Sequence, residues 1–138
     1  MKTKKNIYTL IDANINRSKE GLRVIEDISR FVHSSRANSS RLKRIRHGVD
    51  AGLKKLAPDY RGLIKNRFSG NDVGRSSNNK SEFTRASFEH ILISNFKRVE
   101  ESFRVLEEVS KLVGPKAARI FKELRYETYV LEKDILAR

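Results

Sequence analysis

One stretch of the sequence occurs twice, first as Asn14-Ile-Asn-Arg-Ser-Lys-Glu-Gly-Leu-Arg-Val-Ile-Glu-Asp-Ile-Ser-Arg-Phe-Val32 and again as Asn95-Phe-Lys-Arg-Val-Glu-Glu-Ser-Phe-Arg-Val-Leu-Glu-Glu-Val-Ser-Lys-Leu-Val113. The offset between the copies is 81 residues (95 less 14) throughout, without a gap. A weaker echo follows each copy, Leu42-Lys-Arg-Ile-Arg-His47 in the first and Phe121-Lys-Glu-Leu-Arg-Tyr126 in the second. So many identities at one offset indicate an internal repeat of a single supersecondary unit.

Both copies carry the spacing of an α-helix. Residues that we assign to the inner face recur at alternate steps of three and four. They are Leu10, Asn14, Arg17, Gly21, Val24, Ile28 and Phe31 in the first copy, and Ile91, Asn95, Arg98, Ser102, Val105, Val109 and Leu112 in the second. We therefore predict helices over about 10–33, 37–57, 81–113 and 115–137. Asn38 or Ser39 is the expected cap of the second helix, and Gly114-Pro115 separates the last two.

The links between the predicted helices decide how they pack. Short links at 34–36 and at 114 make the helices on either side of each antiparallel neighbours. The predicted fold is all-α, an up-down-up-down four-helix bundle built from a duplicated helical hairpin. We expect one domain over 1–138, with half-repeats at about 10–57 and 81–137 joined by a loop at 58–80. Ordered loops of that length are usually functional, so we expect a function for this one.

Composition narrows the classes of function. The 138 residues include no cysteine, which excludes disulfides, thiolate zinc sites, Fe–S clusters and Cys nucleophiles. No apolar run approaches the roughly 18 residues of a membrane span, and the basic N-terminus is not a signal peptide, so we expect a cytoplasmic protein without a membrane partner. The formal net charge of +13 points to anionic partners.

Polar residues on the predicted inner face indicate a candidate site. In the predicted bundle the first and third helices run parallel and start at the end that the loop closes. Asn14, Arg17, Asn95, Arg98 and the 72–74 stretch should therefore converge there. Two guanidinium forks and two amides beside a glycine-containing loop suit an oxyanion. The alternative is that these residues set the helix register and form ion pairs within their own helices.

Two further features of the pattern have structural interpretations. Glu26 with Arg46, and Glu107 with Arg125, recur in both halves, and we interpret them as structural ion pairs.

Apolar residues also lie beside the predicted inner face and broaden the apolar arc of two helices. They are Ile11, Ile15 and Leu22 in the first helix and Leu92, Phe96 and Phe103 in the third. A partner surface would cover such residues, so we predict a homo-oligomer.

Several motifs resemble one small helical family. They are Asp12-Ala-Asn-x-Asn-Arg17-x-x-Glu-Gly-Leu-Arg-Val-x-Glu-Asp, Leu42-Lys-x-x-Arg46-His47, Asp72-Val-Gly74 and Asn95-x-Lys-Arg98-x-x-Glu-x-x-Arg-Val-Leu-Glu-Glu. The resemblance spans about 11–131 and is to the monofunctional hydroxymethylpyrimidine phosphate kinases of thiamine biosynthesis, which occur alone or fused ahead of thiamine-phosphate synthase. It implies conversion of the pyrimidine monophosphate to the diphosphate with ATP and Mg²⁺. The resemblance does not extend to the synthase barrel, so we do not expect the synthase reaction.

Phosphoryl transfer needs positioned cations, a metal and an oriented acceptor oxygen. For this chemistry we assign Arg17, Arg98 and Asp72 as catalytic residues. Glu20, Glu101 and Asp72 are the candidate Mg²⁺ ligands. The predicted substrate-binding and phosphate-binding residues are Asn14, Arg17, Arg23, Arg46, His47, Gly74, Arg85, Asn95 and Arg98.

Two other functions remain open. One is a basic helical nucleic-acid-binding protein, although the chain has no recognised module and its aromatic residues are not interleaved with the basic cluster. The other is an accessory or interaction module of a separate thiamine-phosphate synthase. The expected partners are ATP and a phosphorylated pyrimidine, with a possible contact to the synthase, and nucleic acid is not expected.

Overall fold

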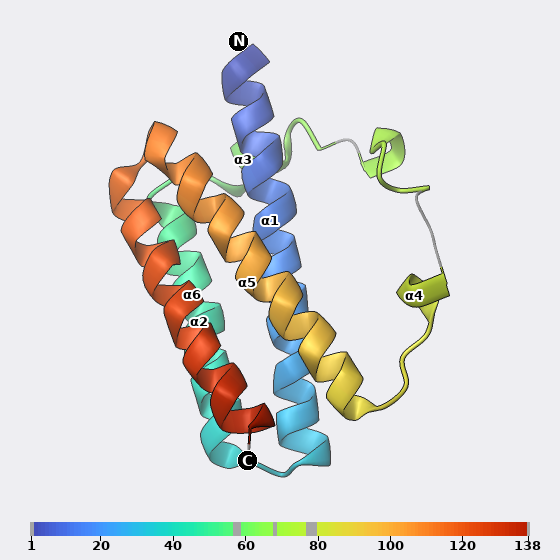
Figure 1. The fold of residues 1–138 in the computed structure, drawn as a ribbon. Helices are drawn as coiled ribbons and strands as arrows, with labels where there is room; N and C mark the ends of the chain where they lie inside the picture. Colours follow the sequence, from blue (N-terminus) through green and yellow to red (C-terminus); the bar gives the residue numbers. More distant parts are fainter. Residues whose placement is uncertain (1, 57–58, 68, 77–79, 138) are drawn as a thin grey trace.

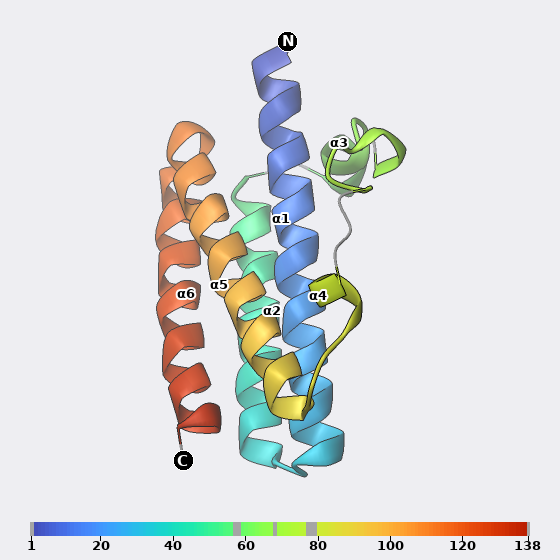
Figure 2. The ribbon, with the colours of Figure 1, turned by 45° about the vertical axis from the view of Figure 1, so that its right-hand side comes forward.

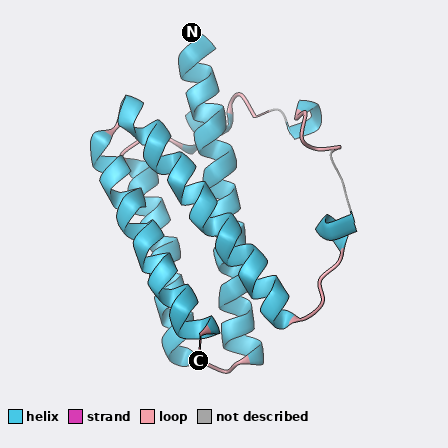
Figure 3. Ribbon diagram, in the orientation of Figure 1, coloured by secondary structure: helices cyan, strands magenta, loops and turns pink. Residues whose placement is uncertain are grey.

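Four long helices pack lengthwise beside one another and make up most of the described chain (Figures 1 and 3). The computed structural model describes residues 2–56, 59–67, 69–76 and 80–137, and within these ranges it contains helices and no strand. The long helices are α1 (Lys2–Asp27), α2 (Arg36–Lys54), α5 (Phe88–Val113) and α6 (Pro115–Leu136). The predicted all-α class is confirmed. No helix in the described ranges is both long and apolar enough to cross a membrane.

Short helical elements complete the chain. A π-helix, η1 (Ile28–Val32), continues α1, and the connection between α2 and α5 contains α3 (Tyr60–Ile64), a 3-10 turn η2 (Ser69–Asn71) and α4 (Lys80–Phe83). Residues 57–58, 68 and 77–79, which include the predicted end of the second helix and part of the predicted loop, lie outside the described residues.

Local capping chemistry explains where the helices begin. The Ser35 hydroxyl accepts a hydrogen bond from the Asn38 N–H at 3.2 Å and caps α2, so neither predicted cap residue has that role. The Ser87 hydroxyl caps α5 in the same way, accepting from the His90 N–H at 3.1 Å. The third helix therefore starts later than predicted. The break at Gly114, with Pro115 in the first turn of α6, is confirmed.

The predicted up-down-up-down order is wrong. Arg41 of α2 pairs with Asp134 at the far end of α6 (2.9 Å), and Gly52 of α2 packs on Phe121 near the start of α6, so these two helices are antiparallel. Because each hairpin is also antiparallel, α5 runs opposite to α1 and in the same direction as α2 (Figures 1 and 2). Short links fix direction only within a hairpin. The long connection carries the chain back along the bundle before α5 begins.

The core lies one helical position away from the predicted inner face. Leu10, Phe31 and Leu112 were expected inside but are 46%, 67% and 74% exposed. The residues assigned to a partner surface form the core instead: Ile11, Ile15, Leu22, Leu92, Phe96 and Phe103 are all buried. The reason is that α1 packs against both α2 and α5 and α5 against both α1 and α6, so each helix buries a wider, shifted arc. That argument for a homo-oligomer is therefore wrong, and the oligomeric state stays a prediction.

α1 and α5 approach each other closely at Gly21. A Cβ atom at this position would lie 2.6 Å from Cγ2 of Val99 and 3.3 Å from the backbone oxygen of Asn95. The χ1 angle of valine is stiff and the backbone oxygen is held in its helix, so neither neighbour can yield cheaply. Gly21 thus sets how closely the two helices approach.

We expect Gly21→Ala to lower the free energy of unfolding. Overpacking a filled core costs about 1–3 kcal/mol, which outweighs the gain of about 1 kcal/mol in helix propensity. Gly48→Ala is the matched control, because its Cβ would meet only the flexible tip of Leu124. Thermal melts should show a lower Tm for Gly21→Ala and a much smaller loss for Gly48→Ala. Equal Tm values for Gly21→Ala and the unmodified protein would contradict this account of the crossing.

A buried carboxylate lies between α5 and α6. The Glu100 side chain is 3% exposed, with the Lys97 Nζ atom 3.3 Å from its Oε1 atom. Lys97 also reaches Glu132 of α6 at 3.4 Å. Burial is the main cause that raises the pKa of Glu100 to about 7, and the neighbouring carboxylate of Glu132 adds to it, while Lys97 opposes it.

We expect this carboxyl to make stability depend on pH. Between about pH 4.5 and 7 the native state holds a proton on Glu100 that the unfolded chain has lost, so the free energy of unfolding falls as the pH rises through this window. Glu100→Gln removes the ionisation and should raise Tm at pH 8 more than at pH 5. The exposed neighbour Glu101→Gln should show no such difference. A Glu100→Gln effect of the same size at both pH values would contradict the assignment.

Candidate functional site

A cavity of about 490 Å³ lies between α1 and the connection that follows α3. It brings together Arg17 of α1 and Asp72 of the connection, two of the residues assigned to catalysis from the sequence. The full lining is Thr9, Leu10, Asp12, Ala13, Asn16, Arg17, Arg67, Asn71, Asp72 and Val73. A cation and a carboxylate therefore face one cavity of the size that small ligands occupy.

A two-point ion pair fastens the connection to α1. The Arg67 Nε atom donates to Oδ2 of Asp12 at 2.7 Å, and the Nη2 atom donates to Oδ1 at 2.5 Å. Asp12 is buried, and its hydrogen bonds are the main cause that raises the pKa of Arg67 above its ordinary value. The pair holds the chain just before η2 against α1, and so places Asp72 near Arg17.

Sequence reasoning missed this pair. Asp12 was noted only as part of a motif, and its partner Arg67 lies 55 residues away in the connection. One signal was present: a carboxylate stands between Ile11 and Ile15, which are both core residues. A buried carboxylate needs a cation, but a single sequence does not indicate which of the many basic residues supplies it.

Asp72 sits in a turn whose geometry is partly local. Its Oδ1 atom accepts a hydrogen bond from the Gly74 N–H at 2.8 Å, which is an Asx turn. The carboxylate is exposed and lines the cavity. Asp72 therefore has a structural role through one oxygen while its side chain remains accessible to a ligand.

The predicted arginines of the inner face are not buried. Arg17 and Arg98 are exposed, and Arg98 lies across from α1 with its Nη2 atom 3.9 Å from Oε1 of Glu20. Exposed guanidinium groups carry little desolvation cost, so they need no buried counterion. Arg98 and Glu20 share the α1–α5 face, whereas Arg98 does not line the cavity with Arg17 and Asp72.

The two predicted amides do not meet at one end. Because α1 and α5 are antiparallel, Asn95 lies against Gly21, seven residues beyond Asn14. Each amide instead donates to its own helix: Asn14 Nδ2 to the Leu10 oxygen at 2.9 Å, and Asn95 Nδ2 to the Ile91 oxygen at 2.8 Å. Asn14 is buried and its Oδ1 atom has no hydrogen-bond partner in the described part of the chain.

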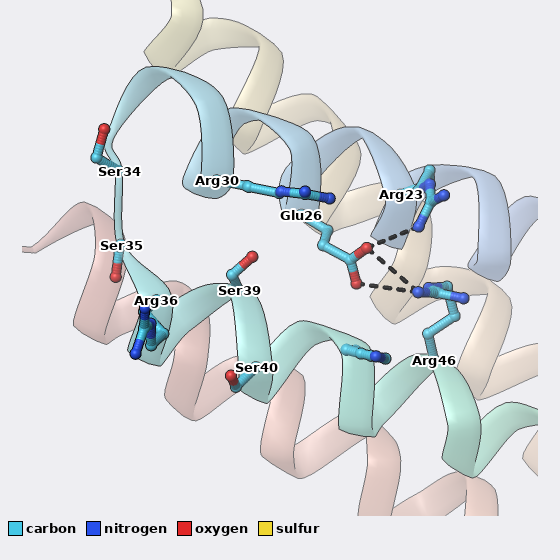
Figure 4. Close-up of a pocket in the computed structure, with 10 residues that line it drawn as sticks. Arg23, Glu26, Arg30, Ser34, Ser35, Arg36, Ser39, Ser40 and Arg46 are labelled. Carbon is cyan, nitrogen blue, oxygen red and sulfur yellow. Dashed lines mark hydrogen bonds and ion pairs between the residues drawn. The ribbon is translucent and has the colours of Figure 1, made fainter.

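Arg23 and Arg46 lie elsewhere, in a cleft between α1 and α2 (Figure 4). Both converge on Glu26, with Arg23 Nη1 at 2.8 Å and Arg46 Nη2 at 3.2 Å from Oε2. The second hairpin repeats the arrangement, with Arg125 Nη2 at 3.2 Å from Oε1 of Glu107. The interpretation of these glutamate–arginine contacts as ion pairs agrees with the structure.

The remaining predicted residues are dispersed. Gly74 lies in the Asp72 turn, and Arg85 precedes α5 and donates to the Thr84 oxygen at 2.9 Å. His47 and Glu101 are exposed on α2 and α5. Within the described residues no group of three or more His, Cys, Asp or Glu side chains is arranged to hold a metal ion. Glu20, Glu101 and Asp72 therefore do not form a three-carboxylate metal site.

Known proteins are similar to this sequence over nearly its full length. It is 38% identical over 130 residues to the thiamine-phosphate synthase of Nostoc punctiforme and 37% identical over 131 residues to that of Synechocystis sp.. The Rhodopirellula baltica thiamine-phosphate synthase is 28% identical over 131 residues. These alignments cover 94–95% of this chain but only 34–36% of each relative, so the chain spans about a third of their length.

No solved structure matches the chain. The model of the ThiD2 family matches residues 9–134, which include most of each long helix and every residue that lines the Asp72 cavity. The chain therefore belongs to the ThiD2 family.

Proposed function

We propose that this chain is an ATP-dependent hydroxymethylpyrimidine phosphate kinase of thiamine biosynthesis. The observation that carries the proposal is the cavity that Arg17 and Asp72 share, in a chain related to thiamine-phosphate synthases. Such a transfer requires cations that neutralise the phosphoryl group and a metal ion, which a carboxylate can hold. The proposed acceptor is hydroxymethylpyrimidine monophosphate.

The chemistry suits a site with few functional groups. An oxygen of the acceptor phosphate attacks the γ-phosphorus of ATP, the bond from that phosphorus to the β–γ bridging oxygen breaks, and ADP leaves. The acceptor oxygen is already ionised, so no general base is needed. What the protein supplies is charge neutralisation and alignment. Arg17 provides the cation at the cavity, and Arg98 provides a second one on the adjoining α1–α5 face.

Asp72 is the residue that fits a magnesium ion best. Mg²⁺ in phosphotransfer sites is held by one or two carboxylates together with the phosphates of the substrate, so a single exposed carboxylate is sufficient. Mg²⁺ would neutralise charge on the β- and γ-phosphates. Glu20 is less suited, because Arg98 lies 3.9 Å from its carboxylate. Glu101, which is exposed on α5, remains a proposed alternative.

The Asp12–Arg67 pair is a positioning element in this proposal. It holds one end of the segment that carries Asp72 against α1. The rest of that segment is then able to cover a bound substrate while the helices stay rigid. Covering the substrate excludes water, which otherwise competes as an acceptor of the phosphoryl group.

We expect Asp72→Asn to lower turnover by about a hundredfold or more, because removal of one electrostatic group from a transfer site costs about 2.7 kcal/mol or more. The amide oxygen keeps the turn with Gly74, so Tm should change little. Asp59→Asn is the matched control: Asp59 caps α3 through the Gly62 N–H at 2.6 Å and does not line the cavity. The assay measures ADP release with ATP, Mg²⁺ and the pyrimidine monophosphate.

Two outcomes of that assay would count against the proposal. Near-normal turnover by Asp72→Asn removes Asp72 from the mechanism. Absence of turnover by the unmodified protein, with Mg²⁺ and both substrates supplied, removes the kinase assignment.

We expect Arg17→Met to weaken phosphate binding without loss of stability. A hydrogen bond to a charged group contributes about 1.5–3 kcal/mol, so the KM for a phosphorylated substrate should rise by about tenfold to a hundredfold. Methionine keeps the helix propensity, and Arg17 is exposed, so its replacement leaves the core unchanged. Arg44→Met, an exposed position on α2 away from this cavity, is the control. A lower Tm with unchanged KM would assign Arg17 a structural role instead.

A second candidate function is an accessory module of a separate thiamine-phosphate synthase. It is favoured by the names of the relatives, in which the matching region is about a third of a longer thiamine-phosphate synthase. Co-elution with a synthase in size-exclusion chromatography, combined with no ATP turnover, would favour it over the kinase.

We also infer that the two hairpins arose by duplication of one unit. Support comes from contacts that repeat at the sequence offset, since Asn14 and Asn95 bond the backbone four residues earlier. Glu26 and Glu107 likewise each receive an arginine from the neighbouring helix.

A further inference from the structure

A strongly cationic cleft of about 550 Å³ lies at the turn between α1 and α2, away from the Arg17–Asp72 cavity. Five cationic side chains line it: Arg23, Arg30, Arg36, Lys43 and Arg46. Glu26 is the one carboxylate in its lining. Figure 4 shows Arg23 and Arg46 converging on that carboxylate from the two helices, while Arg30 lies on the opposite side of it.

Most of this positive charge is not compensated. Glu26 is already shared by Arg23 and Arg46. In the described part of the chain Arg36 and Lys43 have no ion pair, and Arg30 stacks over the Phe31 ring at 4.7 Å without reaching a carboxylate. Three unpaired cations facing one cleft repel each other, and a bound anion would relieve that repulsion.

Hydroxyl groups and an unusual backbone accompany the cations. Ser34, Ser35 and Ser39 line the cleft, and Figure 4 shows the Ser39 hydroxyl directed into the space between the helices. Ser34 has φ 52°, and no other non-glycine residue in the described ranges has a positive φ. The π-helix η1 places Arg30 beside this turn. A positive φ at a residue other than glycine and a π-helical turn both cost energy, and both occur frequently at functional sites.

The cleft between α5 and α6 shows what a similar number of cationic side chains does without the serine hydroxyls. This equivalent cleft, of about 500 Å³, is also lined by five cations and one carboxylate, Glu107. Asp27 and Glu108 stand at equivalent positions beside the two clefts and pair with Arg23 (4.0 Å) and Arg104 (3.0 Å). Glu108 also pairs with Lys111 at 2.6 Å, whereas Arg30, the equivalent of Lys111, has no ion pair in the described part of the chain. Pro115 and Ala118 line it and no serine does. The α5–α6 cleft therefore has fewer uncompensated cations and lacks the serine hydroxyls.

We propose that the α1–α2 cleft binds a diphosphate group, either as the free ion or as part of a diphosphate ester. Three uncompensated cations match the charge of a diphosphate better than that of a single phosphate, and guanidinium and hydroxyl donors suit its oxygens. The site rests on its own observations and not on the proposed kinase activity. Its test is a binding measurement, whose result stands whatever the turnover assay gives.

The experiment is calorimetric titration of the full chain with sodium diphosphate, without Mg²⁺, at fixed salt. The test variant is Arg30→Met/Lys43→Met, and the matched control is Lys111→Met/Lys122→Met, which removes the same charge from the equivalent cleft. We expect at least tenfold weaker binding by the test variant and less than a twofold change in the control. All four side chains are exposed, so both variants should fold, which circular dichroism melts verify.

Amide NMR shifts locate the bound ion and separate the other outcomes. Diphosphate should shift the amides of 34–40, and inorganic phosphate should bind at least fivefold more weakly. Equal weakening in both double variants would show a general charge effect and overturn the proposal. The proposal would also be overturned if diphosphate did not bind, if it shifted only the amides of the Asp72 turn, or if phosphate bound with the same affinity as diphosphate. Displacement of diphosphate by a single-stranded oligonucleotide whose binding weakens in both variants would identify a nucleic-acid surface instead.

Discussion

The close antiparallel crossing of α1 and α5 at Gly21 is the constraint on which the rest of the structure depends. With no side chain at this position, Val99 and the Asn95 backbone lie directly against α1. That register places Arg98 across from Glu20 and turns Ile11, Leu22 and Phe103 into the shared core. It also means that α5 must start at the end of the bundle opposite to the start of α1.

The position of the candidate site follows from that direction. Because α2 ends at one end of the bundle and α5 begins at the other, the chain between them has to run the length of the molecule (Figures 1 and 2). The Asp12–Arg67 pair holds part of this connection on α1. The connection therefore forms one wall of the cavity and contributes Asp72 to it, while α1 forms the other wall.

Local features of the fold were predictable from the sequence, and long-range ones were not. Helical periodicity predicted the helices, Gly114-Pro115 marked their break, and the repeated Glu26–Arg46 pattern indicated an ion pair that is present. The direction of α5 depends on which helices become its neighbours in the bundle. No local sequence pattern indicates that choice. The predicted inner face differs from the observed core by one helical position. The prediction assumed one narrow line of buried residues on each helix, whereas each helix packs against two neighbours. Arg17 and Asp72 share a cavity as expected, but they do so beside α1 and not at a common helix end.

The measurement that tests the central claim most directly is a crystal structure with a non-hydrolysable ATP analogue, Mg²⁺ and hydroxymethylpyrimidine monophosphate. The account predicts phosphate density in the cavity between α1 and the connection, with Arg17 contacting a phosphate and Asp72 near the magnesium ion. It also predicts α5 antiparallel to α1 and the Asp12–Arg67 pair intact. Phosphates bound away from Arg17 and Asp72, or a connection released from α1 in the complex, would contradict it.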